Sequence, residues 1–307
     1  IYTLDGVMHY AKGEIVDTIT SGSDGVASSK ELYLGKYEIQ EITAPHGMVL
    51  NGTIQTVELT YAGQEVAITE TAGNLYNERQ KVKVSLSKVL EQNELFGIGM
   101  NGELKNITFG LYAKTDLVAG DGTVIPAGGL IEIVTFDDNG MATVSTDLPL
   151  GSYYLQERST DEHYILDDTH YEFEFSYGSQ ETHVVEISVN DGNPIKNDLK
   201  YGMVSGRKVD EDGHVIAGAI FGLFRNDENE YTAENAYLTA ESAQDGTFKF
   251  EKVPFGTWVV REIRPAKGFV LNEKAYPVTV SEDGDVVNIQ LENRYIRGNI
   301  EGTKLNE

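Results

Sequence analysis

Three chemically capable side chains recur in a fixed order along this chain: a lysine, then a glutamate, then an asparagine. The complete sets are Lys88, Glu157 and Asn197, and then Lys208, Glu262 and Asn293. Glu41 and Asn77 form an incomplete set before them, and Lys304 follows them alone. Burial lowers the pKa of a lysine and raises that of a carboxylic acid. A buried pair therefore favours a neutral amine, which is a nucleophile, beside an acid that can protonate an amide.

These residue types allow an amide bond to form between two side chains. The lysine amine would attack the asparagine carboxamide, the glutamate would carry the proton, and ammonia would leave. Holding the groups in contact can supply about 7–11 kcal/mol of the barrier. Each set would react once within the folded chain, so we expect single-turnover autocatalysis and no enzyme. For one set alone, a buried salt bridge beside a strand-end asparagine is the simpler interpretation, but recurrence of the set favours the bond.

Strand alternation predicts where these side chains point, because every second residue of a strand faces the same way. In the first complete set, Leu86 stands two residues before the lysine, Leu155 two before the glutamate and Ile195 two before the asparagine. The same parity places Val204 on the face of Lys208. A lone charge on an apolar face would be costly or would be lost. We therefore expect the three polar side chains of a set to satisfy one another.

Two longer repeats contain these residues. One begins at Gly35, Gly151 and Gly256 and reads GKYEIQEITAPHGMVLN, GSYYLQERSTDEHYILD and GTWVVREIRPAKGFVLN. In the other, each asparagine stands eleven residues before a lysine, as in NERQKVKVSLSK, NDLKYGMVSGRK and NRYIRGNIEGTK. Period-two runs of Val, Ile, Thr, Tyr and Phe between Gly, Asp and Asn turns predict short strands. Short strands at regular spacing indicate all-β sandwich or barrel modules repeated along the chain.

The chain resembles the tandem Cna B-type domains, also called SpaA-like domains, of Gram-positive surface adhesins and pilins. The third module carries that pattern closely, with Lys208 in GRKVDEDG, AGAIFGL from Ala217, Glu262 in WVVREIRPAKGF and Asn293 in QLENR. The second module has STDEHY in place of the family's Ala-Pro-x-Gly-Tyr and a longer stretch before its FGLY strand. The resemblance implies Ig-like, prealbumin-like β-sandwiches joined end to end, whose neighbouring first and last strands are tied by Lys–Asn isopeptide bonds.

The repeats divide the chain into four parts. We expect a partial module that lacks its first strands, two complete modules, and the first strand of a further module, at residues 1–79, 80–198, 199–294 and 295–307. We call the first three the first, second and third modules.

The resemblance also assigns roles to single residues. The cross-links would join Lys88 to Asn197 and Lys208 to Asn293, and the catalytic residues would be Glu157, Glu262 and, in the first module, Glu41. Asn77 and Lys304 would be the unpaired halves of the flanking modules. We expect no bond inside the first module, because its lysines do not precede the right strand. Lys304 of one copy could instead dock beside Glu41 and Asn77 of another.

The composition excludes several functional classes. A formal net charge of -25 argues against nucleic acid and anionic membrane surfaces as partners. There is no cysteine, and no stretch is apolar enough to insert into a membrane. The six histidines lack metal-ligand spacing, and we interpret DEDG at Asp210 as a turn rather than a calcium loop, so we expect no metal and no cofactor. Trp258 stands at the same repeat position as Tyr37 and Tyr153, which favours a role in the core over a role in stacking against a bound sugar.

These observations favour a structural stalk or spacer of a bacterial cell-surface adhesin or pilus-like protein. It would be extracellular, anchored to the cell wall through a region outside this sequence, with neighbouring modules of the same long protein as partners. The alternative is a ligand-binding adhesin module that contacts a host or bacterial partner through one sandwich face, through the loop at residues 228–243 or through the segment at residues 109–140. A conventional hydrolase is disfavoured, because no nucleophile-elbow, phosphate-loop or dinucleotide motif appears.

Overall fold

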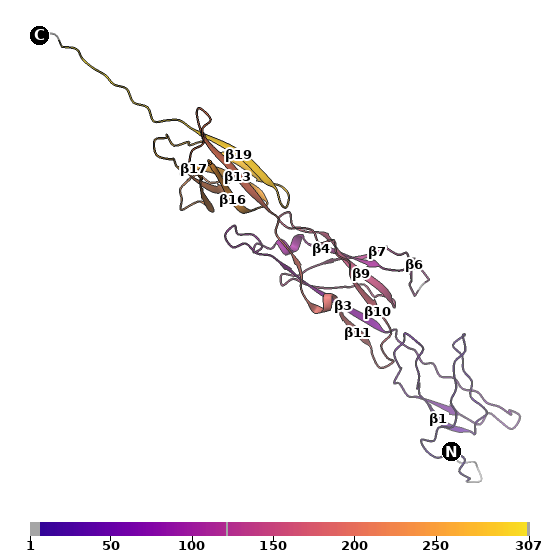
Figure 1. Cartoon of the computed structure of the whole chain (residues 1–307). Helices are drawn as coiled ribbons and strands as arrows, with labels where there is room; N and C mark the ends of the chain where they lie inside the picture. The colour runs from indigo at the N-terminus through magenta and orange to yellow at the C-terminus, as the bar shows by residue number, and fades with distance from the viewer. Residues whose placement is uncertain (1–6, 121, 306–307) are drawn as a thin grey trace. The chain divides into compact units, whose positions relative to one another are not determined.

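The computed structural model describes residues 7–120 and 122–305 (Figure 1). Within these residues the regular elements are strands, apart from the 3-10 turns η1 (Glu103–Asn106) and η2 (Val189–Gly192). The prediction of an all-β fold is confirmed. The residues around Ala236 form a loop that leads into a strand. Among the described residues, no helix has the length and apolar character needed to cross a membrane.

The chain divides into two compact units. The first combines the described residues up to Lys83 with Asp147–Gly151 and Phe175–Glu186. Its sheet is the antiparallel pair β1 (Gly35–Ile39) and β2 (Gln55–Leu59). The second unit contains Val84–Thr146, Ser152–Glu174 and the described residues from Ile187 onward.

Gln80 holds segments of the first unit together. Its buried side-chain amide donates to the carbonyls of Ser179 and Thr182 at 3.1 and 2.7 Å, and its oxygen accepts the N–H of Gly178 at 2.9 Å. A buried amide with unpaired groups would be costly, so these bonds fix the loop around it.

The second module has two sheets, with orders β10-β9-β4-β7 and β11-β3-β12, and β8 pairs with β3 in the second of them. Apolar residues at alternate positions, such as Leu111 and Leu155, are fully buried, as strand parity requires. The small hairpin of β5 and β6 lies outside both sheets. The strands are β3 (Lys81–Leu90), β4 (Thr108–Ala113), β5 (Leu117–Val118), β6 (Val124–Ile125), β7 (Leu130–Thr135), β8 (Met141–Thr143), β9 (Gly151–Ser159), β10 (Tyr171–Phe175), β11 (Val184–Ser188) and β12 (Ile195–Asn197).

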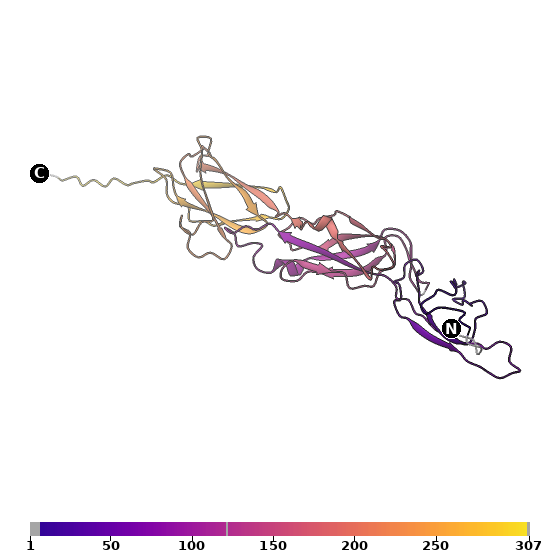
Figure 2. The same ribbon diagram turned by 90° about the horizontal axis from the view of Figure 1, so that it is seen from below.

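The third module also has two sheets, with orders β16-β13-β19 and β15-β14-β17-β18, whose strands run side by side in both views of Figures 1 and 2. Val204, Phe221, Phe250 and Trp258 belong to the core between them. Trp258 is only 9% exposed, which confirms its predicted core role. The strands are β13 (Tyr201–Asp210), β14 (Ile220–Arg225), β15 (Leu238–Glu241), β16 (Thr247–Pro254), β17 (Gly256–Arg264), β18 (Tyr276–Val280) and β19 (Val286–Asn293).

First and last strands are parallel neighbours in the second and third modules. In the third module the ladder between β13 and β19 is continuous from the pair Met203 and Val286 to the pair Asp210 and Asn293. In the second module β12 pairs with β3 over only three residues, and η2 separates β12 from β11. The last strand of the second module is therefore broken where that of the third is continuous.

The two modules fill the core beneath their first strand differently. In the second module Leu86 of β3 faces Ala142 of β8. In the third module Gly206 of β13 faces Phe248 of β16, and a Cβ added to Gly206 would lie less than 3.0 Å from the Phe248 ring. Each pair combines one large and one small side chain, as close packing of a core demands.

Candidate functional site

The second module brings together the three residues of its predicted set. Lys88 lies near the end of β3, Glu157 near the end of β9 and Asn197 at the end of β12. The Lys88 Nζ donates to Asn197 Oδ1 and lies 3.4 Å from Glu157 Oε1. Asn197 Nδ2 donates to Glu157 Oε2 at 2.9 Å. The three side chains thus form a closed triangle in which each one contacts both others.

The third module repeats this triangle with Lys208, Glu262 and Asn293. Lys208 Nζ donates to Asn293 Oδ1 and lies 3.1 Å from Glu262 Oε1. Asn293 Nδ2 lies 3.0 Å from each oxygen of Glu262. Each side chain of the two triangles is at most 3% exposed. Both sets are therefore shielded from water.

Burial lowers the pKa of Lys88 and of Lys208, and the adjacent Glu157 and Glu262 carboxylates oppose that shift without cancelling it. Removing an ammonium group from water favours its neutral form. The amines are therefore held closer to their nucleophilic state than an exposed lysine would be.

A phenylalanine covers each amine. The Phe109 ring centroid lies 5.5 Å from Lys88 Nζ, and that of Phe221 lies 5.6 Å from Lys208 Nζ. Each ring stands directly across from the glutamate of its set, next to a β-bulge. Bulges often re-aim side chains beside reactive sites. The repeat TFGLY and IFGLF signalled these strands in the sequence, but not that their phenylalanines cover the amine.

Backbone groups complete the two sites, and sequence reasoning missed them. The glutamate Oε2 accepts the backbone N–H of Asp167 at 2.7 Å in the second module and of Asn272 at 2.8 Å in the third. The backbone N–H of each lysine donates at 2.7 Å to a turn carbonyl, from Gly140 or Gly246. The sequence did carry a signal for the backbone partner of the glutamate. Asp167 and Asn272 each follow the last leucine of the repeat and stand ten positions after the glutamate of their module.

The first module reproduces two thirds of this arrangement. Asn77 Nδ2 donates to Glu41 Oε2 at 2.6 Å and to the Val49 carbonyl at 2.9 Å. Asn51 N–H donates to Glu41 Oε2 at 2.7 Å. Among the described residues, no lysine contacts Glu41 or Asn77. The lysines between residues 7 and 80 are exposed, and they are Lys12, Lys30 and Lys36.

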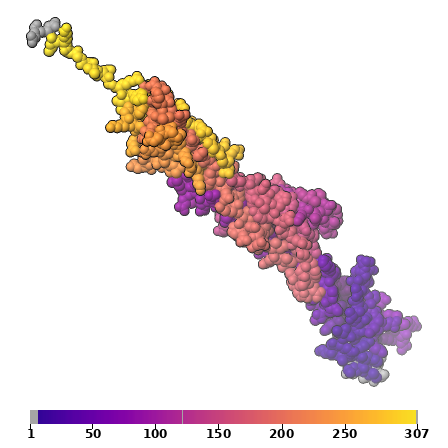
Figure 3. Space-filling model, in the orientation of Figure 1, coloured from indigo at the N-terminus to yellow at the C-terminus, as the bar shows by residue number. Residues whose placement is uncertain are grey.

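Lys304 lies in an extended segment that pairs with no sheet among the described residues. Figure 3 shows this segment as a thin file of atoms at the yellow end of the chain. Ile300, which shares its strand parity, is fully exposed. The structure thus gives Lys304 no glutamate or asparagine partner within the part of the chain that it describes.

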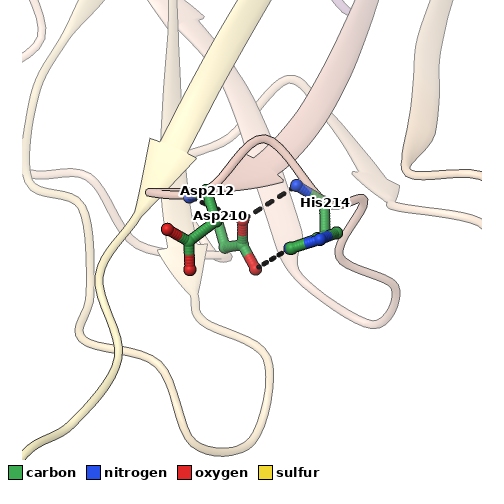
Figure 4. A group of neighbouring side chains, drawn as sticks. All are labelled: Asp210, Asp212 and His214. Atoms are coloured by element: carbon green, nitrogen blue, oxygen red, sulfur yellow. Dashed lines mark hydrogen bonds and ion pairs between the residues drawn. The ribbon is translucent and has the colours of Figure 1, made fainter.

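The Asp210, Asp212 and His214 side chains gather in one turn, with ligand atoms within 4.8 Å of one another (Figure 4). The oxygens of Asp210 are already used within the protein. Oδ1 accepts the N–H groups of Asp212 and His214 at 2.9 and 2.8 Å, and Oδ2 accepts the Tyr295 hydroxyl at 2.5 Å. These hydrogen bonds, with that of Tyr295 the strongest, lower the pKa of Asp210 to about 2. The bonding is that of an aspartate that stabilises a turn.

Comparison with known proteins matches the SpaA prealbumin-like fold domain to residues 2–72, 98–193 and 202–295. The chain belongs to this family, which confirms the resemblance drawn from the repeats.

Two solved structures are similar to this chain over most of its length. The Bacillus anthracis TIE protein is 21% identical with a TM-score of 0.64, and the match covers 90% of this chain but 44% of that one. The chain thus spans less than half the length of that protein. BcpA, the major pilin subunit of Bacillus cereus, is 16% identical with a TM-score of 0.36, covering 90% of this chain and 93% of that one. No curated protein sequence matches the chain.

Proposed function

We propose that this chain is a stalk segment of a bacterial cell-surface adhesin or pilus-like protein, in which Lys–Asn isopeptide bonds close the second and third modules. One observation carries the proposal: two modules bury the same lysine, glutamate and asparagine in the same closed triangle. A buried salt bridge would need no asparagine held against both partners. Membership of the SpaA prealbumin-like fold family, together with the resemblance of the repeats to Cna B-type domains of surface adhesins and pilins, supports the cell-surface setting.

The reaction that we propose balances within each triangle. In the second module Lys88 passes a proton to Glu157, and the neutral amine attacks Cγ of Asn197. A Cγ–Nζ bond forms, the Cγ–Nδ2 bond breaks, and Nδ2 leaves as ammonia with protons relayed by Glu157. The lowered pKa of Lys88 supports the first step, and the 2.9 Å contact between Asn197 Nδ2 and Glu157 Oε2 supports the last.

The mechanical role follows from where the bond would lie. Load enters the third module at the start of β13 and leaves it after β19, which is parallel to β13. Lys208 and Asn293 lie near the matching ends of these strands. A bond between them would carry the load from one strand to the other, so the residues between Lys208 and Asn293 would not be stretched. Similar bonds in neighbouring modules of the same long protein would extend this path, and cell-wall anchoring would come from outside this sequence.

A second candidate function is ligand binding by the second module. Tyr112, Tyr154 and His170 form a partly exposed row of stacked rings, with centroids 4.9 and 4.3 Å apart. Aromatic surfaces with a polar edge are common in recognition sites. A screen against glycans and surface proteins with the wild-type chain and with Tyr154→Ala tests this role, which requires a ligand whose binding the substitution removes.

Intact mass spectrometry tests the stalk proposal. The folded chain should be lighter than its sequence by two ammonia molecules. Glu157→Ala and Glu262→Ala should each restore one of them, whereas Glu251→Ala, which alters an exposed glutamate of β16, should restore none. Fragmentation should recover peptides joined through Lys88 and Asn197. A folded wild-type chain with its full sequence mass would overturn the proposal.

A further inference from the structure

The leaving nitrogen of the second module, Asn197 Nδ2, is surrounded by more hydrogen-bond acceptors than it has hydrogens. A carboxamide nitrogen carries two hydrogens. Three oxygens accept from Asn197 Nδ2, and these are Glu157 Oε2 at 2.9 Å, the Thr160 hydroxyl at 3.1 Å and the Ile165 carbonyl at 2.8 Å. The unreacted amide therefore has to share a hydrogen between two of these acceptors.

The third module surrounds its leaving nitrogen differently. Among the residues that the structure describes, Asn293 Nδ2 donates only to the two oxygens of Glu262, each at 3.0 Å. The hydrogens and the acceptors are equal in number there. The additional hydroxyl is thus a feature of the second module and not a general feature of the fold.

Thr160 belongs to the turn in which the second module departs from the repeat. It is the first residue after β9, within STDEHY. The first residue after β17 in the third module is Pro265, whose side chain has no hydrogen-bonding group. The departure in the sequence therefore places a hydroxyl beside the reacting amide where the third module has a hydrocarbon ring.

Hydrogen bonds outside the reactive triangle hold two of these acceptors in place. Asp161, which follows Thr160, accepts the side-chain amide of Asn106 at 2.7 Å. The backbone N–H of Ile165 donates to the Asp198 carbonyl at 2.9 Å. The hydroxyl and the carbonyl are thus attached to segments whose positions are already fixed, which is what preorganised stabilisation of a reacting group requires.

Ammonia loss changes the number of hydrogens on this nitrogen. Once Lys88 Nζ has bonded to Asn197 Cγ, Nδ2 gains a proton through Glu157 and becomes an ammonium-like group with three N–H bonds, and the Cγ–Nδ2 bond then breaks. Three acceptors match three hydrogens only in that state. Interactions that are stronger in the transition state than in the ground state accelerate a reaction.

We infer that Thr160 is a catalytic residue of the second module, whose hydroxyl accepts a hydrogen bond from the departing ammonia together with Glu157 and the Ile165 carbonyl. The inference rests on the isopeptide chemistry proposed above. The third module carries Pro265 at this place, so its reaction does not depend on a hydroxyl. The two bonds of this chain thus form at leaving-group sites of different composition.

The rate of ammonia loss tests the role of the hydroxyl. Chains isolated unfolded from inclusion bodies are refolded by dilution, quenched at intervals and digested, so that mass spectrometry follows the Lys88–Asn197 and Lys208–Asn293 linkages separately. Thr160→Val keeps the shape of the side chain and removes the hydroxyl. It should slow the second-module linkage about ten- to a hundredfold, the effect of losing a hydrogen bond to a charged group. The third-module linkage of the same molecules should keep its rate.

Three further variants separate catalysis from folding. Thr160→Ser retains the hydroxyl and should link near the wild-type rate. Thr160→Ala lacks the hydroxyl and needs less space, so it should be slow even if valine disturbs the packing. Thr143→Val changes an exposed threonine of β8 and should leave the rate unaltered. Hydrogen exchange in β3 and β12 soon after dilution shows that the second module of each variant has folded before it reacts.

The wild-type chain separates the two proposals. If it loses two ammonia molecules and the folded Thr160→Val and Thr160→Ala variants link at the wild-type rate, this inference is overturned and the stalk proposal stands. A slow Thr160→Ser variant would also overturn it, because the hydroxyl would then not be the group that matters. A folded wild-type chain that loses no ammonia would overturn the stalk proposal, and this inference with it.

Discussion

Removing the Glu262 carboxylate should convert the third module from inextensible to extensible. This side chain contacts both Lys208, at 3.1 Å, and Asn293, at 3.0 Å. Glu262→Ala removes the group that accepts the proton from the amine and relays it to the leaving ammonia. The lysine and asparagine would stay side by side without a bond, and the load would pass through the non-covalent ladder of β13 and β19.

The length released on unfolding follows from the sequence separation of the linked residues. Lys208 and Asn293 are 85 residues apart. A fully extended chain spans about 3.3–3.6 Å per residue, so the module would release about 280–310 Å. Lys88 and Asn197 are 109 residues apart, and Glu157→Ala should release about 360–390 Å from the second module. The two lengths differ enough to identify which module has opened.

Single-molecule force spectroscopy on the chain between marker domains measures these steps. The wild-type chain should show neither step. Glu262→Ala should add the shorter one, Glu157→Ala the longer one, and the double substitution both. Glu251→Ala, with its exposed side chain, serves as the control and should add neither. Circular dichroism before pulling verifies that each variant is folded.

Two results would refute the reasoning. Full-length release steps in the wild-type chain would mean that no bond spans the modules. An unchanged trace for a folded Glu262→Ala variant would mean that the glutamate does not control extensibility.

Three further results are expected in the third module. Gly206→Ala should lower its unfolding free energy by about 1–3 kcal/mol, because the new methyl group meets the Phe248 ring; denaturant unfolding measures this. The pKa of Asp210 falls from 3.8 to about 2 in the folded state, so its contribution is complete above pH 3.8 and is lost as the pH falls towards 2. Asp210→Asn should flatten acid unfolding curves in that window. Because burial lowers the pKa of Lys208 from 10.5, ammonia loss should proceed below that pH and slow as acid protonates the amine; mass spectra of chains refolded at a series of pH values measure this.

Much of the site could be predicted because strand alternation is rigid. A side chain two residues from an apolar neighbour shares its face, so the parity of Leu155 and Glu157 was enough to place the glutamate inside. The repeated order of lysine, glutamate and asparagine then indicated that they meet.

Other features depend on contacts between segments far apart in the chain. The Phe109 ring reaches Lys88 because a β-bulge aligns it opposite Glu157, and a bulge leaves no clear mark in the period-two pattern. The backbone N–H of Asp167 donates a hydrogen bond to Glu157 that does not depend on the Asp167 side chain, so the residue type at position 167 could not reveal this bond.

By itself, the sequence determined the all-β class, the repeat and the inward direction of the reactive side chains, because these depend on local periodicity. Only the tertiary structure decided the length of the parallel ladders, which is three residues between β3 and β12 but continuous from Met203 to Asp210 in β13. It also decided which residues face each other beneath the first strand: Leu86 faces Ala142 in the second module, whereas Gly206 faces Phe248 in the third. Core volume is shared across strands, so each residue of such a pair acquires its meaning only from the partner it faces.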